Sequence, residues 1–269
     1  FGGVYTNSMA ILADALHDLG DAFTLALALY FQRVSQKECD GKFSYGYSRF
    51  STLGTFFNGV ILMTGSVFVL CHTVPRLFDP VSPNTHGILV FSLLGLVING
   101  SAAMAVRRSH VPADANIRLH LMEDVWGWVA VLIAAILMIL YNWVILDAVL
   151  AVIITCFTLY NAYVMLRSST RVLLQGMPAG IKESDIRAKM LAIPNVGRVC
   201  DVHIWSLDGS NHVLTAKVLA KDIGDLSGVE ELRNKIKIEL MALNITHSTI
   251  EIDSANCKGK DTGVESELP

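Results

Sequence analysis

Long apolar runs, separated by short polar segments, fill the first two thirds of the chain. A helix needs about 20 predominantly apolar residues to cross the hydrocarbon core of a bilayer. The pattern therefore predicts five membrane-spanning helices, at residues 4–31, 50–74, 87–106, 119–140 and 145–166. The first contains a cap-like Asn7-Ser8 near its start, and Asp147 interrupts the fifth near its own start.

After Arg171 the apolar segments become shorter. Gly and Pro in residues 172–180 predict a linker. Residues 181–253 then predict the order helix, strand, strand, helix, strand, with a hairpin turn at 208–211 and a capping box at 227–230 that opens the second helix. This order favours a small open α+β sheet with helices on one face.

Composition agrees with a membrane protein that carries a small folded domain. The chain is 52% hydrophobic and 17% charged, and its mean hydropathy is positive. A net charge of −3 argues against nucleic acid as a partner. Five scattered cysteines form no Cys-x-x-Cys pair, so we expect neither a disulfide framework nor a zinc knuckle. The predicted parts are a transmembrane domain, a linker, the α+β domain and a disordered tail, at residues 1–171, 172–180, 181–253 and 254–269.

Lysine and arginine collect in alternate loops. They are frequent between the first and second spans, between the third and fourth, and after the fifth, whereas the other two loops hold only Arg76. By the positive-inside rule, the basic loops and the C-terminal domain are cytoplasmic, and Phe1 lies on the outer side. We therefore expect one further helix before Phe1, six helices in the full protein and a location in the plasma membrane.

The first span contains a group of polar residues that a membrane helix does not normally tolerate. Asp14, His17, Asp18 and Asp21 fall within a narrow arc of one helix, and each charge near the bilayer centre costs about 2.5–3.5 kcal/mol on insertion scales. His17 and Asp21 are one turn apart, and the fourth span repeats the His-x-x-x-Asp spacing at His120 and Asp124. Two such pairs predict a tetrahedral site for a divalent metal ion, with two histidine and two aspartate ligands.

These residues resemble the cation diffusion facilitator family, in its zinc-transporting branch. The matching motifs are the run from Asn7 to Asp21, Phe43-Ser-Tyr-Gly-Tyr47-Ser-Arg49, Asn99, His120-Leu-Met-Glu-Asp124 and Asp201-Val-His203-Ile-Trp205. The resemblance implies a six-helix transmembrane bundle and a ferredoxin-like cytoplasmic domain that helps to join a homodimer. It also implies exchange of Zn²⁺ for H⁺ by alternating access, with His17, Asp21, His120 and Asp124 as the transport site. The short loop at residues 107–118 is typical of a bacterial-type member.

Ligand chemistry supports zinc as the transported ion. Two imidazoles favour Zn²⁺ over Mg²⁺ or Ca²⁺, while Cd²⁺ and Co²⁺ stay open as further cargo. Histidine binds a metal only when neutral, so protons and the metal compete for the same atoms. For Asp14 and Asp18 three roles stay open, namely support of the ligands, a proton relay, or a cap near the pore mouth.

The α+β domain contains a second set of candidate ligands, because the family often binds regulatory zinc there. These are His203, His247, Asp253 and Cys200, with His212 as a weaker candidate. Strand alternation predicts that Cys200 and His203 point to opposite faces of their strand. Two other functions are open for the membrane site, an intramembrane metal-dependent enzyme and a metal sensor. We expect no enzyme, because the chain lacks a His-Glu-x-x-His motif and four protein ligands would close the site.

Overall fold

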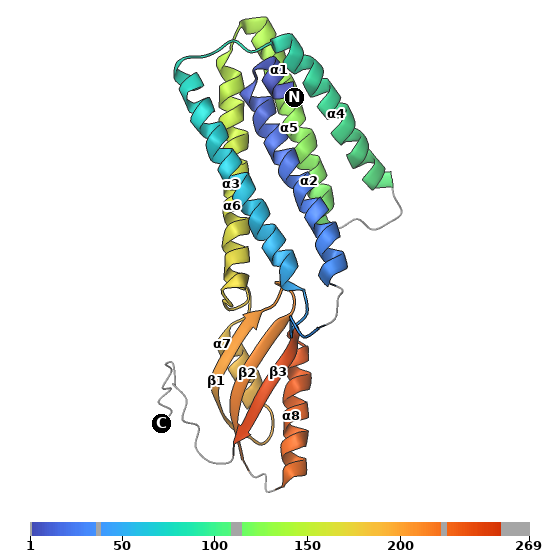
Figure 1. The fold of residues 1–269 in the computed structure, drawn as a ribbon, viewed down its shortest axis with the longest axis vertical. Helices are drawn as coiled ribbons and strands as arrows, with labels where there is room; N and C mark the ends of the chain where they lie inside the picture. The colour runs from blue at the N-terminus through green and yellow to red at the C-terminus, as the bar shows by residue number, and fades with distance from the viewer. Residues whose placement is uncertain (1, 36–38, 109–114, 222–224, 254–269) are drawn as a thin grey trace. The chain divides into compact units, whose positions relative to one another are not determined.

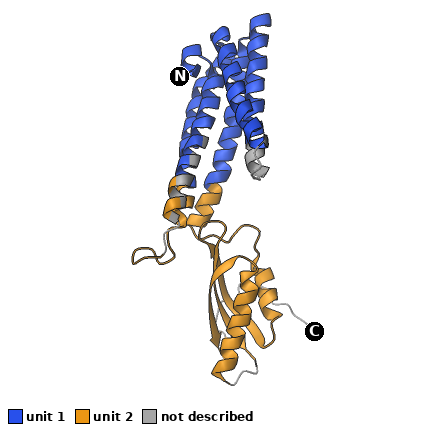
Figure 2. Cartoon of the chain, turned by 90° about the vertical axis from the view of Figure 1, so that its right-hand side faces the viewer, with its two compact units in different colours: residues 1–27, 55–166 blue, residues 28–54, 167–269 orange. Residues whose placement is uncertain are grey.

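The computed structural model describes residues 2–35, 39–108, 115–221 and 225–253 of the chain (Figure 1). The chain divides into two compact units (Figure 2). One consists of residues 1–27 and 55–166, and the other of residues 28–54 and 167–269. The first holds most of a helical bundle, and the second holds the C-terminal domain together with the connection between two of the long helices. The predicted disordered tail, at residues 254–269, lies outside the described residues.

Long helices make up the bundle. In chain order the helices are α1 (Gly2–Thr6), α2 (Met9–Ser35), α3 (Arg49–Phe78), α4 (Thr85–Arg108), α5 (Ala115–Tyr141) and α6 (Ile145–Leu173). Within the described residues, four segments are long and apolar enough to cross a membrane, Arg49–Phe78, Thr85–Arg107, Leu121–Tyr141 and Ile145–Leu173. α2 has 27 residues, which exceeds the length a crossing needs. The predicted transmembrane bundle is confirmed. α3, α4 and α5 extend beyond both predicted ends, whereas the first predicted span is divided into α1 and α2.

The predicted cap at Asn7-Ser8 is a real break between α1 and α2. Asn7 has a φ of 53°, a left-handed conformation that ends α1. Ser8 then caps α2, since its Oγ accepts a hydrogen bond from the Ile11 N–H at 3.2 Å. The carboxylate of Asp147, from α6, completes this cap by accepting from the Met9 N–H at 2.7 Å. The residue that interrupts the fifth predicted span is therefore the anchor for the start of α2.

α2 and α3 interlock through two glycines. A Cβ added at Gly20 of α2 would lie 2.3 Å from Leu62 of α3, and a Cβ added at Gly65 of α3 would lie 2.6 Å from Leu16 of α2. Each leucine thus fills the notch that the opposite glycine leaves, which is a common way for membrane helices to approach closely. This interlock fixes how α2 is turned about its own axis.

Apolar side chains also cover the outside of the bundle. Val97 and Ile98 of α4 are 68% and 64% exposed, and Leu140 of α5 is 67% exposed. Inside, buried residues of α2, α3, α4, α5 and α6 form one cluster. A surface as apolar as the interior suits a lipid environment.

The C-terminal domain has the predicted order of elements. α7 (Glu183–Leu191), β1 (Val196–Ser206), β2 (His212–Ala220), α8 (Leu226–Met241) and β3 (Ile245–Asp253) follow one another along the chain. The sheet order is β1-β2-β3, with β1 antiparallel to β2 and β2 parallel to β3. Both helices pack on one face of the sheet, since their buried residues join those of all three strands in a single core. The predicted α+β domain is confirmed.

Two local predictions in this domain are wrong. The cap of α8 is Asp225, whose side chain accepts from the Gly228 N–H at 3.1 Å, so the helix does not start with a capping box at Ser227. In β1, Asp201 has a φ of 48° and the register with β2 shifts between Cys200 and His203. This bulge adds one residue to the strand. Cys200 then pairs with Lys217 and His203 with Thr215, so the two lie on the same face.

Candidate metal centre

His17 of α2 and Asp124 of α5 meet inside the bundle. His17 Nε2 lies 3.9 Å from Asp124 Oδ1, and the two side chains are only 19% and 10% exposed. They are far apart in the sequence, so folding alone brings them together. One imidazole nitrogen and one carboxylate oxygen at this separation suit two ligands of a metal ion whose bonds to them are about 2.0–2.2 Å long.

The other two predicted ligands occupy the expected places on the same helices. Asp21 follows His17 by one turn on α2, and His120 precedes Asp124 by one turn on α5. Because the two helices run antiparallel (Figure 1), both backbone positions lie toward the same end of the bundle. The side chains of Asp21 and His120 lie outside the described residues, so the complete set of four ligands stays a prediction.

Asp14 also faces α5. Its side chain is 5% exposed, and its Oδ1 lies 3.7 Å from the position that a Cβ would take at Gly127. In the described part of the chain, Asp14 Oδ2 has no hydrogen-bond partner. Asp18, by contrast, is exposed. Of the two carboxylates whose roles the sequence left open, Asp14 is therefore the one that belongs to the space between α2 and α5.

Two asparagines of the bundle, Asn58 and Asn99, serve the helices themselves. Asn58 of α3 is fully buried, and its amide reaches Met165 Sδ of α6 at 3.8 Å. Asn99 of α4 donates to the Gly95 carbonyl of its own helix at 3.2 Å. Neither contact points to a metal ligand.

The candidate ligands of the C-terminal domain do not gather at one point within the chain. His203 bonds to Asp201 Oδ1 at 3.1 Å, and Asp253 pairs with Lys217 Nζ at 3.2 Å. His247 stands edge-on to the ring of Tyr45, with centroids 5.5 Å apart. Asp253 follows His247 by six positions along β3, a distance of about 20 Å at the rise of a strand.

The remaining two candidates are also engaged. Cys200 is 2% exposed and disulfide-bonded, so it does not present a thiolate. His212 is buried, with Nδ1 3.3 Å from Ser206 Oγ. Among the described residues, no three His, Cys, Asp or Glu side chains lie close enough to share an ion. A regulatory zinc site in this domain stays a prediction.

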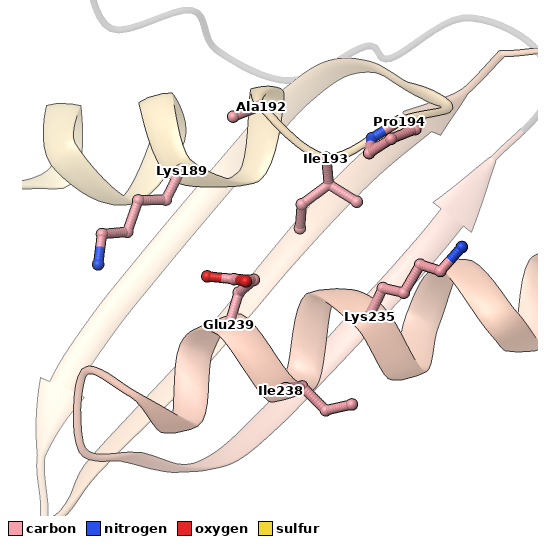
Figure 3. Close-up of a pocket in the computed structure, with 7 residues that line it drawn as sticks. All are labelled: Lys189, Ala192, Ile193, Pro194, Lys235, Ile238 and Glu239. Carbon is pink, nitrogen blue, oxygen red and sulfur yellow. The ribbon is translucent and has the colours of Figure 1, made fainter.

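The hollows of the C-terminal domain are not metal centres either. A groove of about 390 Å³ lies between α7 and α8. Lys189, Lys235 and Glu239 are its charged lining residues (Figure 3). A second hollow of about 310 Å³ is lined by Tyr45, His247 and Lys237 among others. Neither hollow gathers the ligands of a divalent ion, because a single carboxylate lines the first and a single histidine lines the second.

Two residues that shape the site had no predicted role. Gly127, one turn after Asp124, leaves space beside Asp14. Asp147 anchors the start of the helix that carries His17. A small residue one turn from a predicted ligand, and a carboxylate at the start of a span, are the signals that could have identified them.

Comparison with known proteins shows which family the chain belongs to. The model of the cation efflux transmembrane domain matches residues 1–174, which is more than half of the chain. The chain belongs to the cation efflux family. Membership makes it an integral membrane transporter and not an enzyme, and it confirms the resemblance seen in the motifs.

Three curated relatives span almost the whole chain. A cadmium, cobalt and zinc/H(+)-K(+) antiporter of Bacillus subtilis is 31% identical over 94% of this chain and 83% of its own length. The metal cation efflux system protein CzcD of Cupriavidus metallidurans is 32% identical over 97% of this chain and 83% of its own. The zinc transporter ZitB of Pectobacterium atrosepticum is 29% identical over 95% of this chain and 80% of its own.

Proposed function

We propose that this cation efflux protein exports Zn²⁺, with Cd²⁺ and Co²⁺ as further cargo, in exchange for protons. The ion occupies a tetrahedral site made by His17, Asp21, His120 and Asp124, which opens alternately to the two sides of the membrane. The observation that carries the proposal is the approach of His17 Nε2 to Asp124 Oδ1, from two different helices, within the bundle. The names of the relatives, which include zinc, cadmium and cobalt transport and antiport, support the same cargo.

Proton exchange follows from the ligands. An imidazole coordinates a metal only in its neutral form, so a proton that arrives at His17 or His120 competes with the ion for the same nitrogen. A proton gradient directed inward then favours release of the metal on the outer side. The empty site takes up protons there and carries them back to the inner side. The basic loops support a cytoplasmic C-terminal domain. We also propose a homodimer, as in the family that the motifs resemble.

The test is transport into sealed liposomes that contain the purified protein. A zinc-responsive dye and a pH-responsive dye in the lumen follow both ions after zinc is added outside an acid-loaded vesicle. We expect zinc to enter while protons leave, and we expect the rate in His17→Ala and Asp124→Ala to fall to that of vesicles without protein. Asp18→Asn, an exposed carboxylate on the same helix, is the matched control and should transport like the unaltered protein.

Two results would contradict the proposal. Transport by both alanine variants at the unaltered rate would remove His17 and Asp124 from the ion pathway. Zinc binding without movement of zinc against its gradient would favour a sensor in place of a transporter.

A further inference from the structure

Asp14 is a buried carboxylate for which the fold provides no structural partner. It is 5% exposed, and its Oδ2 accepts no hydrogen bond from any described residue. Buried polar groups in proteins are almost always hydrogen-bonded, and an isolated buried carboxylate is costly. Asp147, also a buried carboxylate of the bundle, shows the contrast, because both of its oxygens accept bonds from the start of α2.

Capping does not explain Asp14. α2 begins at Met9, so Asp14 lies beyond the first four N–H groups that a helix leaves without a partner. On the neighbouring helix α5, Gly127 faces this carboxylate, since an added Cβ there would stand 3.7 Å from Asp14 Oδ1. That distance is ordinary contact, so a methyl group would fit there. Glycine at position 127 therefore leaves a space beside the carboxylate of Asp14. The approach of α2 to α5 does not require this space.

The open space lies directly along the bundle from the proposed transport site. Asp14 precedes His17 by three residues on α2, and Gly127 follows Asp124 by three residues on α5. Since the two helices run antiparallel (Figure 1), both steps lead toward the end of the bundle where α2 begins. Three residues of helix rise about 4.5 Å. In the proposed orientation this end is the outer side.

We propose that Asp14, beside Gly127, forms a second position for the divalent cation, one helical turn outward from the transport site. The ion that leaves His17 and Asp124 exchanges onto this single carboxylate and keeps water in its other coordination places. One carboxylate binds a divalent ion weakly, so the position passes the ion onward without trapping it. This inference rests on the proposed function and adds an exit step to it.

The experiment compares Asp14→Asn with Asp18→Asn. Both exchange a carboxylate for an amide of the same shape on the same helix, but only Asp14 is buried against α5. For each variant, zinc affinity is measured at equilibrium in detergent, and the zinc transport rate is measured in liposomes. We expect Asp14→Asn to slow transport at least about tenfold, the lower end of the effect of removing a group that supports a metal site. Its zinc affinity should stay within about twofold, and Asp18→Asn should change neither quantity.

Gly127→Ala gives an independent arm, because it keeps the carboxylate and fills the space beside it. We expect slower transport with unchanged zinc affinity. A direct measurement uses His17→Ala/Asp124→Ala, in which the transport site is removed. Equilibrium dialysis with Cd²⁺ should show weak residual binding that disappears when Asp14→Asn is added.

Three results would overturn the inference. Transport by Asp14→Asn at the unaltered rate would place Asp14 off the ion path. A loss of zinc affinity in Asp14→Asn as large as that in His17→Ala would make Asp14 part of the transport site itself. Residual Cd²⁺ binding that survives Asp14→Asn would assign the weak position to other groups. The proposed function fails separately, if the unaltered protein moves no zinc.

Discussion

Asp147→Ala tests whether one carboxylate of α6 holds the start of α2. Asp147 is 4% exposed and Ser8 is 1% exposed. The carboxylate accepts from the Met9 N–H at 2.7 Å and the Ala10 N–H at 3.3 Å, and it also accepts a short bond from the Ser8 hydroxyl. Ser8 Oγ in turn accepts from the Ile11 N–H at 3.2 Å. Asp147 and Ser8 together thus satisfy the first three N–H groups of α2.

The size of the effect follows from these bonds. Loss of a helix cap costs about 0.5–2 kcal/mol, and a buried donor left without an acceptor costs about 1–3 kcal/mol. Asp147→Ala leaves two backbone donors and one hydroxyl without their acceptor, near a helix end that water can partly reach. We therefore expect a loss of about 3 kcal/mol in the free energy of unfolding. Asp147→Asn keeps one carbonyl acceptor and should lose about 1 kcal/mol.

The assay is reversible unfolding in mixed detergent micelles with increasing dodecyl sulfate, followed by far-ultraviolet circular dichroism. Asp79→Ala is the matched control, because Asp79 is an exposed carboxylate in the loop after α3. Ser8→Ala completes a double-mutant cycle, and a coupling energy well above zero is expected for residues in direct contact. If Asp147→Ala unfolds at the same detergent fraction as Asp79→Ala, the anchor does not stabilise the bundle and the reasoning fails.

Two further predictions follow from packing and from titration. Gly95→Ala should destabilise the bundle by about 1–3 kcal/mol, because its Cβ would lie 2.2 Å from the Trp128 ring. Gly100→Ala, on the same helix, meets nothing within 4 Å and should be tolerated. Equal unfolding of the two variants would contradict this packing. In the C-terminal domain, burial is the main cause that lowers the pKa of His212 below its usual 6.5. The folded state therefore resists protonation, so stability is complete above about pH 6.5 and falls as the pH drops through that value. Hydrogen exchange of the β1–β2 peptides at pH 7.5 and 5.5 should show this loss of stability in the unaltered protein and a smaller loss in His212→Gln. An equal loss of stability in both proteins would assign the pH dependence to other groups.

Much of the fold could be predicted because its signals are periodic. Apolar runs long enough to span a bilayer identified the long helices, and the change of period after Arg171 identified the α+β domain. The start of α8 was misplaced because Asp225 and Ser227 are both good caps, and only the folded chain shows which one binds an N–H. The bulge at Asp201 has no periodic signal, so the face shared by Cys200 and His203 could not be predicted.

The metal centre, too, has a part that a periodic pattern predicts and a part that only the packing of the helices decides. Two copies of His-x-x-x-Asp on separate spans were enough to predict that His17 and Asp124 converge, and the structure brings them together. The spacing could not separate Asp14 from Asp18, because four residues of helix turn them only about 40° apart. Which of the two is buried depends on how α2 is turned against its neighbours, and no local pattern records that angle.

That angle is set by residues next to the ligands themselves. Leu16 and Gly20, which interlock with Gly65 and Leu62 of α3, each precede a predicted ligand, His17 and Asp21, by one residue. One face of α2 is thus fixed to α3, and the adjacent face directs Asp14 and His17 toward α5. Because consecutive residues of a helix differ by about 100°, a rotation of α2 large enough to turn His17 away from Asp124 would also pull both leucines out of their notches. Opening of the site to either side is then easier if α2 and α3 move together as one body, away from α5, than if α2 turns alone.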